Sequence, residues 1–98
     1  MNIQAMMKQA QKLQKDMMNA KAEIDKTEFE ATSSFVKVRA NGKREILEVK
    51  ITTESLEKED LEMLEDMILL AVNDANKKID EFTEKKMGKF GNSMPGLF

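Results

Sequence analysis

A repeating run of apolar residues at the start of the chain constrains the fold more than any other feature. It predicts a helix over residues 3–24 with a narrow apolar seam along one face. Such a helix is on the order of 35 Å long, whereas a globule of 98 residues has a radius of gyration of about 13 Å. Part of the helix must therefore overhang its own core or meet a second chain, unless its outer half lies on its own sheet. The seam consists of Ile3, Met6, Ala10, Leu13, Met17, Ala20 and Ile24.

The apolar period changes to two in the next part of the chain, which predicts three short strands. The dipeptide Asn41-Gly42 favours a two-residue type I′ turn, so we expect the second and third strands to pair antiparallel across it. Residues 32–34 are expected to form the first connection, and the adjacent Ile46 and Leu47 suggest a bulge or a strand covered on both faces. The apolar positions of the three strands are Phe29 and Ala31, then Val36, Val38 and Ala40, then Leu47, Val49 and Ile51.

A second helical pattern begins after an acidic stretch. The acids lie near the expected N-terminus of this helix, where the macrodipole favours negative charge, so they need no metal ion. Residues 67–72 are apolar around the whole helix, and a three-stranded sheet can cover only one side of them. We therefore expect a homodimer, with an interface formed by Met67, Ile68, Leu70, Ala71 and Val72.

These patterns together predict an α+β fold with the order helix, three antiparallel strands, helix. The length of the chain leaves room for one domain, which we assign to residues 1–88. Residues 89–98 contain two glycines and the only proline, and they are expected to form a flexible tail.

Composition excludes most catalytic chemistry. The chain has no Cys and no His, which removes thiol nucleophiles, the usual zinc sites and imidazole acid–base schemes. Ser55 and Lys58 have the spacing of a serine–lysine pair, but the companion motifs are absent. We expect no enzymatic activity, no metal, no cofactor and no small-molecule substrate. No apolar run is long enough to span a bilayer and no signal peptide is evident, so we expect a cytoplasmic protein with no membrane partner.

The charge distribution points to an anionic partner for the first half of the chain. The net charge is −2 overall, but residues 1–50 carry +3 and residues 51–98 carry −5. A stripe on the first helix lies away from the apolar seam and has few carboxylates nearby, although three lysines on an exposed helix are ordinarily a solvated face. A second patch surrounds the expected hairpin, and it would make the outer face of the sheet basic if its side chains point away from Val36 and Val38. The candidate phosphate-binding residues are Lys8, Gln11, Lys12 and Lys15 on the helix, and Lys37, Arg39, Lys43 and Arg44 on the hairpin.

Four segments, in order along nearly the whole chain, resemble the YbaB/EbfC family of bacterial nucleoid-associated proteins. They are residues 6–15 (MMKQAQKLQK), residues 36–38 with Asn41-Gly42, residues 64–75 and the terminal MPGLF at residues 94–98. The resemblance implies a tweezer-like homodimer that binds duplex DNA and alters its conformation. Two departures affect loops, since residues 32–34 replace a glycine-rich connection and Thr52-Thr53 replaces an Asp-Pro.

We therefore expect a nucleoid-associated protein that binds double-stranded DNA as a homodimer, organises the nucleoid and has a possible role in gene regulation. The alternative is a dimeric adaptor that binds a protein partner through its helices and its C-terminal tail. The tail carries Met94, Leu97 and Phe98, and the nine methionines of the chain suit adaptable apolar surfaces.

Overall fold

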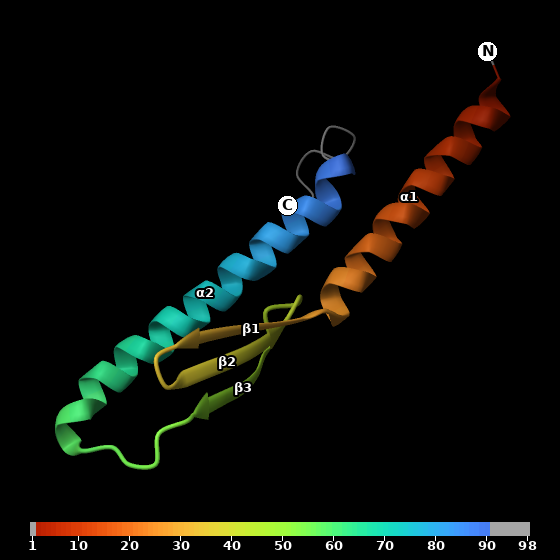
Figure 1. The fold of residues 1–98 in the computed structure, drawn as a ribbon. Coiled ribbons are helices and arrows are strands. Elements are labelled where there is room, and N and C mark those ends of the chain that lie inside the picture. The colour runs from red at the N-terminus through yellow and green to blue at the C-terminus, as the bar shows by residue number, and fades with distance from the viewer. Residues whose placement is uncertain (1, 91–98) are drawn as a thin grey trace.

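In the computed structural model, which describes residues 2–90, one long helix lies along a three-stranded sheet and a second long helix projects beyond the end of that sheet (Figure 1). The order helix, three strands, helix confirms the predicted α+β fold. Residues 91–98, including Met94, Leu97 and Phe98 of the expected tail, lie outside the described residues. The elements are α1 (Ile3–Lys26), β1 (Glu28–Ser33), β2 (Val36–Asn41), β3 (Ile46–Ile51) and α2 (Leu61–Met87), with 3₁₀ turns at Lys58–Asp60 and Gly88–Phe90.

Helix α1 begins at a side-chain cap and extends beyond the rest of the molecule. The side-chain oxygen of Asn2 accepts a hydrogen bond from the backbone N–H of Ala5 at 3.1 Å, which satisfies one of the free donors at the helix start. At the other end of the seam Met17 and Ile24 are buried, whereas Ile3 is 67% exposed. The radius of gyration is 19.5 Å and the longest dimension is 72 Å. The predicted overhang is therefore confirmed.

Two apolar clusters hold the elements together. The larger cluster lies between α2 and the sheet, and the smaller one anchors the C-terminal half of α1 against the end of α2. The first contains Ala31, Val36, Val38, Ala40, Ala71, Ala75 and Ile79, and the second contains Met17, Ile24, Met87 and Phe90. Phe90 had been assigned to the flexible tail, but it lies in the 3₁₀ turn after α2 and is buried against α1.

The sheet has the order β1-β2-β3 with both pairs antiparallel. Its register places Val38 opposite Val49, and an irregularity beside Ala40 sets Ile46 opposite that residue, so Leu47 is the extra residue on β3. The bulge expected from the adjacent Ile46 and Leu47 is confirmed. The first connection is shorter than expected, because residues 32 and 33 extend β1 and only Ser34 and Phe35 form the turn.

The predicted type I′ turn at Asn41-Gly42 is wrong, although the hairpin itself is present. Asn41 ends β2, and residues 42–45 form a longer connection in which Arg44, with φ 69°, takes the left-handed conformation. The Asn41 side-chain oxygen accepts hydrogen bonds from the backbone N–H groups of Lys43 and Glu45. This side chain therefore folds the loop back on itself, as asparagine does in many turns.

Gly42 is required by close approach to α1. A Cβ atom at this position would lie 1.8 Å from the backbone oxygen of Ile24. The N–H of Gly42 donates to the backbone oxygen of Thr27 at 3.1 Å, so the loop is held against the end of α1. The hairpin thus fixes where α1 leaves the body of the molecule.

Candidate nucleic-acid interface

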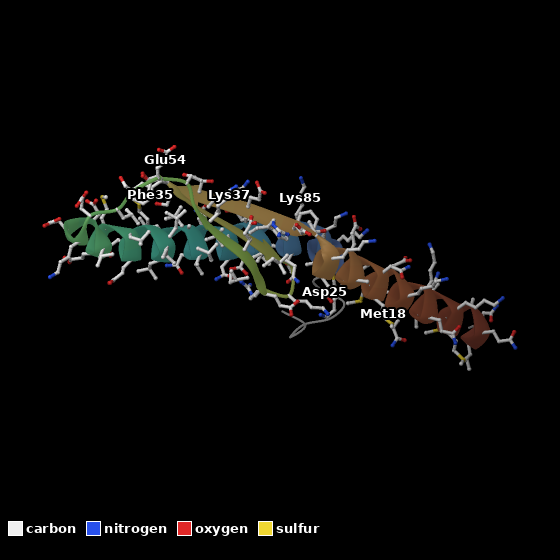
Figure 2. The ribbon with its side chains drawn as sticks, turned by 90° about the horizontal axis from the view of Figure 1, so that it is seen from below. Met18, Asp25, Phe35, Lys37, Glu54 and Lys85 are labelled. Carbon is white, nitrogen blue, oxygen red and sulfur yellow. The ribbon has the colours of Figure 1, made fainter. Side chains whose placement is uncertain are left out.

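The lysines of the predicted helical stripe lie on the part of α1 that extends beyond the sheet. Lys8, Lys12 and Lys15 are exposed, as is Gln11 between them. Within residues 2–90 none of the three lysines forms an ion pair. Figure 2 shows side chains projecting from all around this part of the helix, with no other element beside it. Their ammonium groups are therefore available to an external anion.

The outer face of the sheet presents a different arrangement. Lys37 and Arg39 point away from the core, as expected, but β1 and β3 place carboxylates beside them. The Lys37 ammonium lies 3.3 Å from Glu30, and the Arg39 guanidinium lies 2.6 Å from Glu28 and 3.9 Å from Glu48. The expectation of a basic outer face is wrong, because these three glutamates balance Lys37, Arg39 and Lys50 on the same face.

The carboxylates also affect the ionisation of Arg39. A hydrogen bond to Glu28 raises the pKa of the Arg39 guanidinium above its ordinary value, and the negative charges of Glu28, Glu48 and Glu30 act in the same direction, whereas partial desolvation opposes them. The Arg39 guanidinium therefore already has carboxylate partners within its own chain. A phosphate that binds here has to compete with those partners.

The hairpin loop contributes one unpaired lysine. Arg44 donates a hydrogen bond to the side-chain oxygen of Asn76 and forms an ion pair with Asp80, so it ties the loop to α2. Lys43 is exposed and forms no ion pair within residues 2–90. Of the four predicted hairpin residues, Lys43 is the one whose charge is left for a partner.

The residues predicted for a dimer interface occupy three environments. Ala71 is fully buried in its own core, Leu70 is 60% exposed, and Met67, Ile68 and Val72 are half-buried at the edges of the contact with the sheet. The sheet covers only one side of this apolar segment, as expected.

Sequence reasoning did not predict two features of the sheet. One is the exposed apolar surface of β3, and the other is the set of glutamates that neutralise the cations on the outer face. The period-two pattern placed Leu47, Val49 and Ile51 on one face of a strand but did not predict that every residue of this strand is exposed. The carboxylates could have been found by their parity, because Glu28, Glu30 and Glu48 alternate with the core positions of their strands and so share a face with Arg39. The exposure of β3 depends on the placement of α2, for which the sequence carries no signal.

Two observations concern other kinds of site. Among residues 2–90 no cluster of three or more potential metal-ligating acids is present. In the same part of the chain, neither long helix has the length and apolar character needed to cross a membrane.

The geometry is that of a protein in which an exposed, lysine-bearing helix projects from an α+β body. Residues 1–94 match the model of the YbaB/EbfC DNA-binding family. The chain belongs to this family.

Relatives that match nearly the full length of this chain are named nucleoid-associated proteins. A nucleoid-associated protein of Oceanobacillus iheyensis is 48% identical over 101 residues, covering 99% of this chain and 97% of the relative. Nucleoid-associated proteins of Pelotomaculum thermopropionicum and Ligilactobacillus salivarius are 46% and 43% identical, each covering 99% of this chain and 96% and 95% of the relative.

Proposed function

We propose that this protein binds duplex DNA as a homodimer through the lysine stripe of α1, and that it organises and deforms DNA in the nucleoid. The single observation that carries the proposal is the position of Lys8, Lys12 and Lys15, which are exposed and without an ion pair among residues 2–90 on an arm that extends beyond the fold. Membership of a DNA-binding family and the names of the relatives support it.

Dimerisation gives this stripe enough charge to act on DNA. Three lysines on one helix make a weak site for a polyanion, but a two-fold axis doubles the set and presents two arms to the duplex. Each lysine that neutralises a phosphate releases condensed counterions, so the affinity depends on all six acting together. Phosphate contacts carry no sequence information, so any preference arises from groove shape or from amide contacts such as those of Gln11.

The acidic remainder of the protein restricts where DNA can bind. The chain has a net charge of −2, and the acids around the start of α2 repel phosphates from that end. The basic arm then becomes the favoured contact, because opposite charges at the two ends orient the molecule in the field of the DNA.

The experiment is a gel-retardation titration on linear duplex DNA. Changing Lys8, Lys12 and Lys15 together to Glu should weaken binding by about 100-fold or more, since all six counterion-releasing contacts of the dimer are lost. The matched control changes Lys58, Lys77 and Lys85 to Glu, which are exposed lysines without an ion pair in the described region and alter the net charge equally. Equal retardation by the wild type and the α1 variant overturns the assignment of the site.

A further inference from the structure

Two methionines of α1 are exposed although they do not lie on its apolar seam. Met7 is 56% exposed and Met18 is 65% exposed, and neither belongs to the two apolar clusters. Met18 projects outward from the helix in Figure 2. Met7 precedes Gln11 by four residues and Met18 follows it by seven, so the three side chains lie along one line. We call Met7, Gln11 and Met18 the methionine edge.

The methionine edge borders the lysine stripe. Met7 directly precedes Lys8, and Met18 lies one helical turn beyond Lys15. A single exposed apolar side chain is common on protein surfaces, but here two of them lie next to cations that have no ion-pair partner within residues 2–90. A polyanion held by these lysines therefore meets the two methionines.

The opposite edge of the stripe is acidic. Asp16 lies four residues after Lys12, is exposed and forms no ion pair within residues 2–90. Glu23 continues this edge seven residues further along the helix. Carboxylates repel phosphates, so a duplex bound at the stripe is favoured on the side of the methionine edge. The charges of α1 thus select which of its two edges faces the DNA.

The shape of α1 fits one groove of the duplex. Its N-terminal half is a single helix with no other described element beside it (Figures 1 and 2). A helix with its side chains is about 10–12 Å wide, and the major groove is about 12 Å wide, whereas the minor groove measures only about 6 Å. Met7 and Met18 are about 16 Å apart along the helix axis, which corresponds to about five base-pair steps. Both methionines can therefore reach base edges while the lysines contact the adjoining phosphates.

We propose that α1 lies in the major groove with its methionine edge on the bases, and that Met7 and Met18 contact the C5 methyl groups of thymines. The inference rests on the proposed function and adds a source of sequence preference beyond groove shape and the Gln11 amide. The thymine methyl is the apolar group that base edges present in this groove, where they otherwise present hydrogen-bond donors and acceptors. Two flexible thioether side chains can cover such methyl groups.

The residue between the two methionines favours the same base pair. A glutamine amide can donate to N7 and N6 of adenine in the pattern that its major-groove edge offers. Gln11 lies on the same line as Met7 and Met18, so it faces the bases when they do. The methionine edge therefore favours duplexes rich in A·T pairs.

Replacing thymine by uracil tests the proposal, because it removes the C5 methyl group and leaves base pairing intact. The full chain is titrated by fluorescence anisotropy, at one fixed salt concentration, with an alternating A·T duplex and with the same duplex made with uracil. The wild type should bind the thymine duplex about tenfold more tightly, since burying each methyl-sized group contributes about fourfold and a dimer brings four methionines to the DNA.

The responsible side chains are tested by Met7→Gln with Met18→Gln, which keeps side-chain length and helix propensity. This variant should discriminate between the thymine and uracil duplexes by less than about twofold. It should bind the uracil duplex within about twofold of wild type, because its lysines are unchanged. The matched control is Ile3→Gln with Met6→Gln, which alters apolar side chains that are 67% and 54% exposed on the seam of the same helix. The control should keep the tenfold preference.

Cytosine methylation provides a test of opposite sign. 5-Methylcytosine adds a C5 methyl group to the major groove of an alternating G·C duplex, which contains no thymine. The wild type should bind the methylated duplex about threefold or more tightly than the unmethylated one. Met7→Gln with Met18→Gln should bind the two duplexes equally.

The outcomes separate this inference from the proposed function. Equal wild-type binding to the thymine and uracil duplexes overturns the methyl contact and leaves phosphate binding by the lysine stripe standing. A preference that survives Met7→Gln with Met18→Gln, or that disappears in the seam control, also overturns the assignment to the methionine edge. A wild type that binds none of the duplexes contradicts the proposed function itself.

Discussion

The lysine stripe of α1 and the outer face of the sheet contain the same kinds of cation but differ in their neighbours. Lys8, Lys12 and Lys15 are exposed on a helix that no other element accompanies at that point. Lys37 and Arg39 lie between two strands, and carboxylates from both strands contact them. A count of basic residues does not distinguish these regions, whereas their partners do.

The difference arises from the geometry of the two elements. On a projecting helix a side chain meets only residues three and four positions away, and the stripe has few acids at those positions. On a strand in the middle of a sheet it also meets residues from both neighbouring strands. The sheet therefore neutralises its cations within the chain, and the helix leaves them for a partner.

The largest effect is expected when the α1 lysines are given carboxylate neighbours, as the cations on the outer face of the sheet already have. Gln4→Glu with Gln11→Glu places a carboxylate four residues before Lys8 and before Lys15, in the favourable orientation for helical ion pairs. DNA affinity in a gel-retardation assay should fall by about tenfold or more, since the dimer gains four negative charges at its phosphate contacts.

The control for this variant is Gln4→Ala with Gln11→Ala, which removes the amides without adding charge. It should change affinity by less than about threefold. Unchanged affinity in the glutamate variant shows that DNA is bound elsewhere on the molecule.

The reverse change removes carboxylate neighbours from the cations on the outer face of the sheet. Glu28→Gln with Glu30→Gln releases Lys37 from its carboxylate partner and leaves Arg39 with only its distant contact to Glu48. DNA affinity, measured by fluorescence anisotropy, should increase by about threefold as this face acquires net positive charge. Glu62→Gln with Glu65→Gln on α2 is the matched control, and an equal increase there attributes the effect to net charge alone.

The smallest effect is expected from removing the paired cations themselves. Lys37→Ala with Arg39→Ala should change DNA affinity by less than about twofold, because both side chains are already neutralised. Thermal unfolding should show a loss of less than about 1 kcal/mol in stability, as is usual for exposed ion pairs. A loss of affinity comparable with that of the α1 charge reversal contradicts the distinction between the two regions.

Much of the fold follows from periodicity alone. The spacing of apolar residues predicts both helices and all three strands, and the adjacent Ile46 and Leu47 predict the bulge. The loop at Asn41 was predicted with the wrong geometry, because the sequence shows the turn-forming residues but not the approach of Gly42 to Ile24. That contact joins segments far apart in the sequence.

The candidate site was less predictable than the fold. The position of the α1 lysines away from the seam follows from helical geometry, and the structure places them in solvent. The pairing of Arg39 with Glu28 depends on the register of β1 against β2, which sequence patterns leave undetermined. The exposure of β3 depends on where α2 lies across the sheet, a tertiary arrangement with no local signature.

The most direct measurement of the central claim is the salt dependence of duplex DNA binding. If Lys8, Lys12 and Lys15 of both copies each neutralise one phosphate, the logarithm of the binding constant should fall against the logarithm of salt concentration with a slope of roughly −5. Changing the three lysines to Gln should bring the slope close to zero. A wild-type slope near zero, or a slope of roughly −5 that survives the three substitutions, would contradict the account.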